Sequence, residues 1–187
     1  LRSSDGGNRA FQFGNAADRP TPGDFTGDGK ADLAYFRPST GEWFILRSTG
    51  GTEIQTFGVS GDKPAPADDD GDGRDDVAIF RPANGQWWIN RSTTGLFAAS
   101  FGQATDRAVV GDYNGDAKAD LAFFRPATGE WFVLRTNDFS FYSFPFGLGS
   151  DLPVPGDYDG DGKTDAAVYR PDTGTWYLNR STAGVLI

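Results

Sequence analysis

Short apolar runs alternate with clusters of Gly, Asp, Asn and Pro along the whole chain. No segment of 11 residues has its apolar positions at helical spacing. The last quarter shows the pattern most clearly, with runs at 151–158, 164–171, 175–181 and 184–187 separated by the turn sequences DGDGK, DTG and TAG. Aromatic and β-branched residues fill the runs, which favours short strands joined by tight turns.

The pattern repeats four times with a period of about 44 residues. Four separate features share this period. They are Phe-Gly (Phe13, Phe57, Phe101, Phe146), Arg-Pro (Arg37, Arg81, Arg125, Arg170), a tryptophan (Trp43, Trp87, Trp131, Trp176) and an aspartate (Asp24, Asp68, Asp112, Asp157). We therefore expect one repeat domain over 1–187, with units at approximately 15–58, 59–102, 103–147 and 148–187, and with 1–14 as the end of a preceding unit or a latching strand.

Four short strands in each unit of 40 to 50 residues are typical of a β-propeller blade, so the predicted fold is all-β, with blades of four antiparallel strands. Trp43 and Phe44 are adjacent, and their side chains point to opposite faces of one strand. The same pair of aromatic positions recurs in every unit, which indicates that both faces are buried between neighbouring blades. Stacking of these tryptophans on a sugar is the weaker interpretation.

Each unit also contains an acidic loop between its first two strands. The loops read DFTGDGKAD, DDDGDGRDD, DYNGDAKAD and DYDGDGKTD, and we number their positions 1 to 9. Calcium takes six to eight oxygen ligands, and side chains at alternate positions of a tight loop can converge on one ion. The candidate ligands are the side chains at positions 1, 3, 5 and 9 and the backbone carbonyl at position 7: Asp24, Thr26, Asp28, Lys30, Asp32; Asp68, Asp70, Asp72, Arg74, Asp76; Asp112, Asn114, Asp116, Lys118, Asp120; Asp157, Asp159, Asp161, Lys163, Asp165.

The alternative is a set of Asx turns without metal. Four copies at one place in the repeat favour calcium, up to four ions per chain, because clustered carboxylates are costly without a counter-ion. The loops differ, since Thr26 and Asn114 replace Asp at position 3 and Ala117 replaces Gly at position 6. We expect the second and fourth loops to bind most tightly and the third to be strained if position 6 has a positive φ.

These motifs together resemble the FG-GAP (VCBS-type) repeat family over residues 11–187. The resemblance rests on Phe-Gly, Pro-Gly-Asp, D-x-D-x-D-G-x-x-D and Leu-Ala-x-Phe-Arg-Pro. It implies a β-propeller, often of seven blades, calcium held by Asp24, Asp28, Asp32 and their equivalents, and an extracellular or cell-surface location. It does not specify a ligand, because propellers have many functions.

The two ends of the chain suggest self-association. Residues 1–3 match 46–48, and 184–187 match 95–98, so 9–14 and 184–187 are both candidates for a fourth strand. Three outcomes are open: a latched four-blade ring, part of a larger propeller, or subunits joined end to end by strand exchange into a filament.

One outer strand is unusually aromatic. The segment 138–146 reads DFSFYSFPF, and its equivalents in the first two units have far fewer aromatic residues. We predict a partner surface at Phe139, Phe141, Tyr142, Phe144 and Phe146, with packing against an extra loop as the alternative. A recurring acid (Asp18, Asp62, Asp106, Asp151) and the recurring Arg of Arg-Pro also predict ion pairs, which we expect between neighbouring blades.

Composition narrows the function. The chain has no His and no Cys, and its 26 acidic against 17 basic residues give a net charge of −9. A phosphate-binding nucleic-acid protein is excluded, no apolar run is long enough to span a membrane, and catalysis is disfavoured. We expect a non-enzymatic, secreted, calcium-stabilised structural, assembly or adhesion module whose partners are copies of itself or neighbouring blades. The alternative is a lectin-like module that recognises an extracellular glycan or protein.

Overall fold

The computed structural model describes residues 10–187 and consists of β-strands joined by turns and loops. The strands form four antiparallel sheets of four strands each. In chain order the sheets are β1 (Arg19–Pro20), β2 (Leu33–Arg37), β3 (Glu42–Leu46), β4 (Thr52–Thr56); β5 (Lys63–Pro64), β6 (Val77–Arg81), β7 (Gln86–Arg91), β8 (Gly95–Ser100); β9 (Arg107–Ala108), β10 (Leu121–Arg125), β11 (Glu130–Leu134), β12 (Phe141–Pro145); and β13 (Leu152–Pro153), β14 (Ala166–Arg170), β15 (Thr175–Arg180), β16 (Gly184–Leu186).

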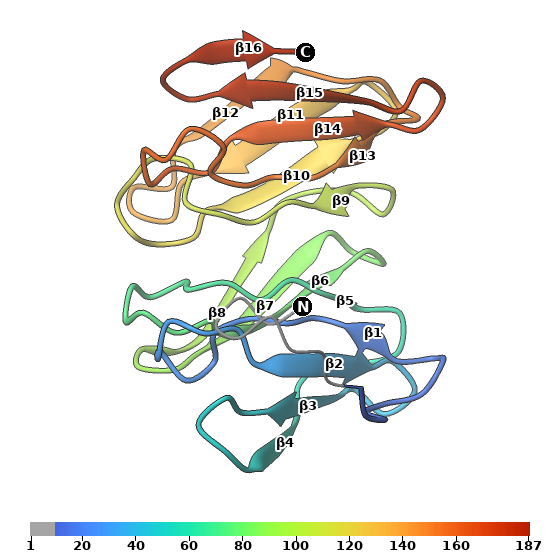
Figure 1. Ribbon diagram of the computed structural model, residues 1–187, viewed down its shortest axis with the longest axis vertical. Coiled ribbons are helices and arrows are strands. Elements are labelled where there is room, and N and C mark those ends of the chain that lie inside the picture. The colour runs from blue at the N-terminus through green and yellow to red at the C-terminus, as the bar shows by residue number, and fades with distance from the viewer. Residues whose placement is uncertain (1–9) are drawn as a thin grey trace.

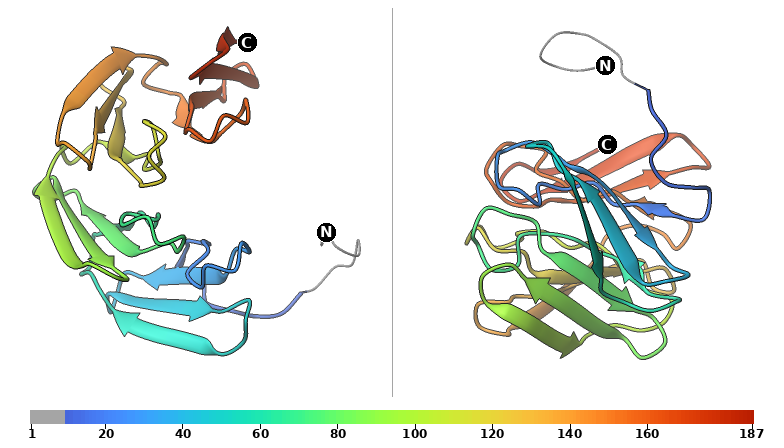
Figure 2. Two further views of the ribbon diagram at one scale, coloured as in Figure 1. Left: turned by 90° about the vertical axis from the view of Figure 1, so that its left-hand side faces the viewer. Right: turned by 90° about the horizontal axis from the view of Figure 1, so that it is seen from below.

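Each sheet pairs its strands in sequence order, as a propeller blade does. The four blades follow one another along an arc, with the first and last blades at its two ends (Figure 1 and Figure 2, left). The predicted all-β fold of four repeated, four-stranded blades is thus confirmed. Each sheet lies within one of the four repeat units defined above.

The core is divided among the three junctions between successive blades. At the first junction, Phe36, Trp43 and Ile45 pack against Val77 and Ile79 of the second blade. Equivalent clusters join the second blade to the third and the third to the fourth. The indole N–H of Trp43 donates to the carbonyl of Phe57 (2.8 Å), and those of Trp87 and Trp131 donate to the equivalent carbonyls. Core packing is therefore the role of these three tryptophans.

The two ends of the arc lack such a junction. Trp43, Trp87 and Trp131 are fully buried, whereas Trp176 in the last blade is 50% exposed. At the other end, Leu33 is 49% exposed, although its equivalents Val77, Leu121 and Ala166 are buried. Within residues 10–187, no buried apolar cluster joins the last blade to the first. The arrangement leaves part of one blade face open at each end, at Trp176 in the last blade and at Leu33 in the first, where Phe13 already covers the neighbouring Tyr35.

The recurring acid and arginine do form ion pairs, but within one blade and not between neighbouring blades. The guanidinium of Arg81 binds both carboxylate oxygens of Asp62, at 2.9 Å each, and the other three pairs repeat this geometry. The expectation of inter-blade pairs was wrong because the aspartate precedes the first strand of the same blade, beside the end of the second strand. The link between neighbouring blades uses the backbone carbonyl of this aspartate, since the guanidinium of Arg19 in the first blade donates to the carbonyl of Asp62 in the second.

Of the two segments expected to compete for one strand position, β16 is the fourth strand of the last blade. Residues 10–14 belong to no strand. The remainder of the expected latching segment, residues 1–9, lies outside the described residues.

Candidate metal centres in the acidic loops

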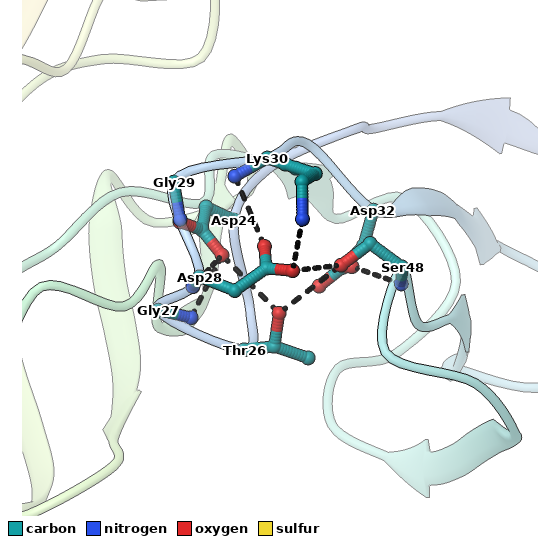
Figure 3. Close-up of polar contacts among 8 residues, drawn as sticks. All are labelled: Asp24, Thr26, Gly27, Asp28, Gly29, Lys30, Asp32 and Ser48. Atoms are coloured by element: carbon teal, nitrogen blue, oxygen red, sulfur yellow. Dashed lines mark hydrogen bonds and ion pairs between the residues drawn. The ribbon is translucent and has the colours of Figure 1, made fainter.

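Each acidic loop connects the short first strand of a blade to its long second strand. An isolated antiparallel bridge closes the base of each loop, pairing Gly23 with Asp32 in the first blade and the equivalent residues in the others. The bridge brings position 9 back beside the start of the loop. The candidate ligands at positions 1 to 9 are therefore gathered on the inside of one tight turn, as Figure 3 shows for Asp24, Thr26, Asp28 and Asp32.

The aspartate at position 1 organises the loop backbone. Asp24 accepts backbone N–H groups from Gly27 (2.7 Å), Asp28 (3.2 Å) and Gly29 (2.7 Å). Asp68, Asp112 and Asp157 accept the same three groups in their own loops. Burial raises the pKa of Asp24, but these hydrogen bonds outweigh it and leave the pKa below its ordinary value. The carboxylate is thus kept ionised, as a metal ligand must be.

The aspartate at position 9 ties the loop to the end of the third strand. It is almost fully buried in all four loops and accepts a backbone N–H from Ser48, Ser92, Thr136 or Ser181. In the first loop the other carboxylate oxygen, Oδ2 of Asp32, is buried without a partner. Burial raises the pKa of Asp120 to about 6, which records the cost of holding this charge without a cation.

The aspartate at position 3 distinguishes the second and fourth loops. Oδ2 of Asp70 accepts the Thr93 hydroxyl at 2.5 Å, and Oδ2 of Asp159 accepts the Thr182 hydroxyl at the same distance. The second oxygen, Oδ1, of each aspartate is buried without a partner. In these two loops, the carboxylates at positions 1, 3 and 9 bring one oxygen each within 4.8 Å of one another.

These oxygens fit a hard cation. Buried carboxylate oxygens are normally hydrogen-bonded, so the unpaired Oδ1 at position 3, close to the carboxylates at positions 1 and 9, marks a place that calcium or a similar ion can fill. Asp68, Asp70 and Asp76 would hold it in the second loop, and Asp157, Asp159 and Asp165 in the fourth. All the side chains in these sets carry oxygen ligands, which suits calcium better than zinc or copper.

The first and third loops present hydrogen-bond donors at position 3. The Thr26 hydroxyl donates to Asp24 at 3.4 Å. The Asn114 amide donates to Asp116 at 3.2 Å and to Asp120 at 3.5 Å. In the second and fourth loops, position 3 instead supplies a carboxylate oxygen that is buried without a partner. The inequality of the four loops expected from the sequence thus has a geometric basis.

Position 6 has positive φ in every loop. Gly29, Gly73 and Gly162 have φ between 76° and 84°, and Ala117 is at 63°. The predicted strain at Ala117 is therefore present, because an L-residue with a Cβ is disfavoured in this region.

The loops also connect neighbouring blades. The backbone N–H of Asp75 donates to the carbonyl of Asp24 in the preceding loop (2.7 Å), and Ala119 and Thr164 repeat this bond. The long side chain at position 7 reaches back in the same way, so that Lys118 lies against Gly71. A cation that orders one loop would therefore also order the junction beside it.

The aromatic residues of the third blade divide into two groups. Tyr142, Phe144 and Phe146 pack against the core between the third and fourth blades. Phe139 and Phe141 are 60% and 68% exposed. The partner surface predicted from the sequence remains a prediction, and only these two of its five residues are largely exposed.

Sequence reasoning missed two sets of residues. The serines and threonines that bind the loop carboxylates come from a recurring Arg-Ser-Thr sequence after the third strand, at 47–49, 91–93 and 180–182. The second is Asp69, a buried acid at loop position 2. Comparison of the repeats would have revealed it, because Phe25, Tyr113 and Tyr158 occupy this position in the other loops.

The described part of the chain contains no helix capable of crossing a membrane. A family model described as FG-GAP-like repeat matches three overlapping segments, 24–79, 68–123 and 112–168. No curated protein matches the sequence. A solved structure of an Agrocybe aegerita lectin, described as recognising non-reducing terminal N-acetylglucosamine, is similar with 17% identity and a TM-score of 0.57. The similarity covers 91% of this chain and 52% of the lectin chain, so this chain spans about half the length of the lectin.

Proposed function

This chain belongs to the FG-GAP-like repeat family, and from that premise we propose that it is a calcium-stabilised, non-enzymatic structural or adhesion module of the extracellular space that associates end to end with a second copy. The similarity to a lectin at 17% identity concerns the fold alone. The support for the proposed function comes from the acidic loops and from the two open blade faces.

Calcium is supported by the unpaired, buried carboxylate oxygens of the second and fourth loops. An extracellular location is supported by the family and by calcium itself, because weak sites of this kind are filled at extracellular calcium concentrations. With calcium bound, the loops would stiffen the arc and hold its two ends at a defined angle.

One observation carries the proposal of association: the half-exposed Trp176 occupies a position that is fully buried in the other three blades. Its face is equivalent to the faces of Trp43, Trp87 and Trp131, each of which packs on the next blade. The face that those tryptophans cover is equivalent to the open face at Leu33. The two open faces are therefore expected to pack on each other in the way that successive blades pack at the three internal junctions.

A second copy is the proposed occupant because each copy has both halves of the junction, so two copies placed head to tail would cover all four open faces in a closed ring. This packing of faces replaces strand exchange as the preferred mode, because β16 already completes the outer edge of the last blade.

Sedimentation velocity in calcium over a range of concentrations tests the association. We expect a dimer for the native chain and a monomer for Trp176→Arg and for Leu33→Arg. Phe141→Arg, which changes an exposed aromatic residue away from both end faces, is the matched control and should remain a dimer. Equimolar Trp176→Arg and Leu33→Arg should associate with each other, because each variant retains the face that the other lacks. A native chain that stays monomeric at all concentrations contradicts the proposal.

The second candidate function is recognition of a glycan. It is supported by the cavity described next. A screen of the calcium-loaded chain against immobilised glycans tests it, and binding by the Trp176→Arg monomer would establish recognition without association.

A further inference from the structure

Two departures from the repeat meet at the junction of the second and third blades. Asp69 stands where the other loops have an aromatic residue. Phe139 stands where the other units have a glycine of positive φ, namely Gly51, Gly95 or Gly184. A ligand site in a repeat protein requires residues that its sister units lack, so the coincidence of two such changes at one junction is informative.

The change to Asp69 leaves space between the blades. In the third and fourth loops the equivalent tyrosines reach the carbonyls of Val109 and Val154, at 2.6 and 2.8 Å. An aspartate is too short to fill that volume. A cavity of about 400 Å³ lies here, lined by Asp69, Arg91, Thr94, Lys118 and Asn137 together with the loop carboxylates Asp70 and Asp116.

The cavity contains polar atoms without partners. Asp69 is 97% buried (3% exposed), and its Oδ1 accepts no hydrogen bond. Nε of Arg91, which also lines the cavity, is buried without a partner, as is Nε of the equivalent Arg135 in the next blade. Buried polar groups are almost always paired, so the unpaired acceptor on Asp69, which has no counterpart in the other loops, indicates that a ligand with a hydrogen-bond donor completes it.

A pair of aromatic side chains lies beside Arg91, one of the residues that line the cavity. The guanidinium carbon of Arg91 lies 4.2 Å from the centroid of the Phe97 ring, and Phe139 stacks on Phe97 with ring centroids 6.2 Å apart. Phe139 has φ of 57° and is 60% exposed. A bulky residue in this backbone region is strained, and such strain persists mainly at functional sites. Its exposed ring is available for a planar or apolar ligand face.

The charges of the lining favour a neutral ligand. Arg91 and Lys118 disfavour a cation, and the carboxylates of Asp70 and Asp116 disfavour an anion. A ring with several hydroxyls can donate to Asp69, accept from Arg91 and Asn137, and place its C–H face on an aromatic side chain. We propose that the junction of the second and third blades binds a sugar ring, with Asp69 and Arg91 as its polar contacts and Phe139 as its stacking platform.

This inference goes beyond end-to-end association, because none of these residues lies on an end face. It supplies the second candidate function with a site. Association and sugar binding can therefore fail separately, and the Trp176→Arg monomer allows sugar binding to be measured without association.

The test is saturation-transfer NMR of the calcium-loaded chain with glucose, galactose, mannose and N-acetylglucosamine as probes, and with n-butylamine as the cationic probe. Asp69→Tyr restores the aromatic residue of the repeat, and Phe139→Gly restores its glycine, so both variants are expected to fold, which thermal unfolding checks. For any sugar that binds, each variant should lower the affinity roughly tenfold or more, since a lost charged hydrogen bond or stacking contact has this effect. Phe141→Ala, on the same outer edge but outside the cavity lining, should leave the affinity unchanged.

Three results would overturn the proposal. The first is binding of none of the four sugars by the native chain. The second is equal binding by the native chain and both restoring variants, which would place the site elsewhere. The third is binding of butylamine in preference to the sugars, which would assign the cavity to a cation. If Asp69→Tyr fails to fold, Phe139→Gly decides alone.

Discussion

The second and fourth acidic loops have an aspartate at position 3 that the first and third loops lack, on a common backbone. All four loops have the closing bridge and the position 1 aspartate bound to three backbone N–H groups. At position 3, Asp70 and Asp159 add a buried oxygen without a partner, whereas Thr26 and Asn114 add a hydrogen-bond donor.

The comparison separates the shape of the loop from the charge of its side chains. The repeat backbone makes a concave loop in every unit, because glycines and Asx hydrogen bonds suffice to shape it. The residue at position 3 then determines whether the loop brings three carboxylate oxygens together or instead donates a hydrogen bond to one of its own carboxylates. We therefore expect the four loops to look alike in shape and to differ in affinity for calcium.

Removal of calcium should have the largest effect, because it acts on all the loops at once. An ion that binds only the folded chain adds about 2.7 kcal/mol per site when its concentration is 100 times its Kd. Calorimetric unfolding with calcium and with a chelator measures the difference. Equal unfolding temperatures in the two conditions would contradict calcium binding and, with it, the expected difference between the loops.

The next largest effect should come from exchanging position 3 between the loop types. Asp70→Asn should abolish the tight site of the second loop and cost about 2.7 kcal/mol of the calcium-dependent stability, on the same arithmetic. Asn114→Asp should strengthen the third loop. Titration calorimetry of both variants checks this exchange, and Thr26→Ala serves as a control with little change. If Asp70→Asn and Thr26→Ala behave alike, position 3 does not determine affinity.

Acidity should act in opposite directions with and without calcium. Burial raises the pKa of Asp69 to about 8 and of Asp120 to about 6 in the metal-free chain. A carboxyl whose folded pKa exceeds its unfolded value opposes folding above the folded pKa, and this cost disappears as the pH falls through it. The metal-free chain should therefore gain stability from pH 8 to pH 5, whereas the calcium-bound chain should lose it as its ligands are protonated. Denaturant unfolding at several pH values measures both trends, and parallel curves would contradict the assignment.

The Asp–Arg pairs determine the pH below which the metal-free chain stops gaining stability. Arg170 hydrogen-bonds Asp151 and lowers its pKa, although burial opposes the shift. The stability from a carboxyl of lowered pKa is complete above its unfolded pKa of about 3.9 and is lost as the pH falls further. The metal-free chain should consequently be most stable near pH 5.

The smallest effect should come from Ala117→Gly. Ala117 has φ of 63°, where the other loops have glycine, so the substitution relieves backbone strain. We expect a gain of about 0.5–1 kcal/mol after the extra flexibility of glycine in the unfolded chain is subtracted. Gly162→Ala is the reverse control and should lose a similar amount, because its Cβ would meet no atom within 4 Å and only the dihedral angle changes. Chemical denaturation without calcium measures both.

Much of this structure follows from the period of the sequence. The repeated Phe-Gly, Trp and Asp positions predicted four blades, and the adjacent aromatic residues Trp43 and Phe44 predicted burial on both faces of their strand. The acidic loops were found because their ligand spacing is local. Local spacing could not reveal which blade each aspartate of the Arg pairs would contact, so the inter-blade assignment was wrong.

Other features depend on three-dimensional context. Trp176 and Trp87 share the local pattern Gly-x-Trp-aromatic-x-Asn-Arg-Ser-Thr, and only the position of its blade at the end of the arc exposes Trp176. The cavity beside Asp69 requires residues from two blades to meet. The recurring serines and threonines after the third strand were visible in the sequence, but their contact with loops about 20 residues away depends on the fold.

The central claim is that the acidic loops bind calcium and that two of them bind it more tightly. Titration calorimetry of calcium into the chelator-stripped chain, with native mass spectrometry to count the ions, tests it directly. We predict two tight sites, removed singly by Asp70→Asn and Asp159→Asn, and weaker binding at the other two loops. Absence of heat and of bound ions, or four identical sites unaffected by either substitution, would contradict the account.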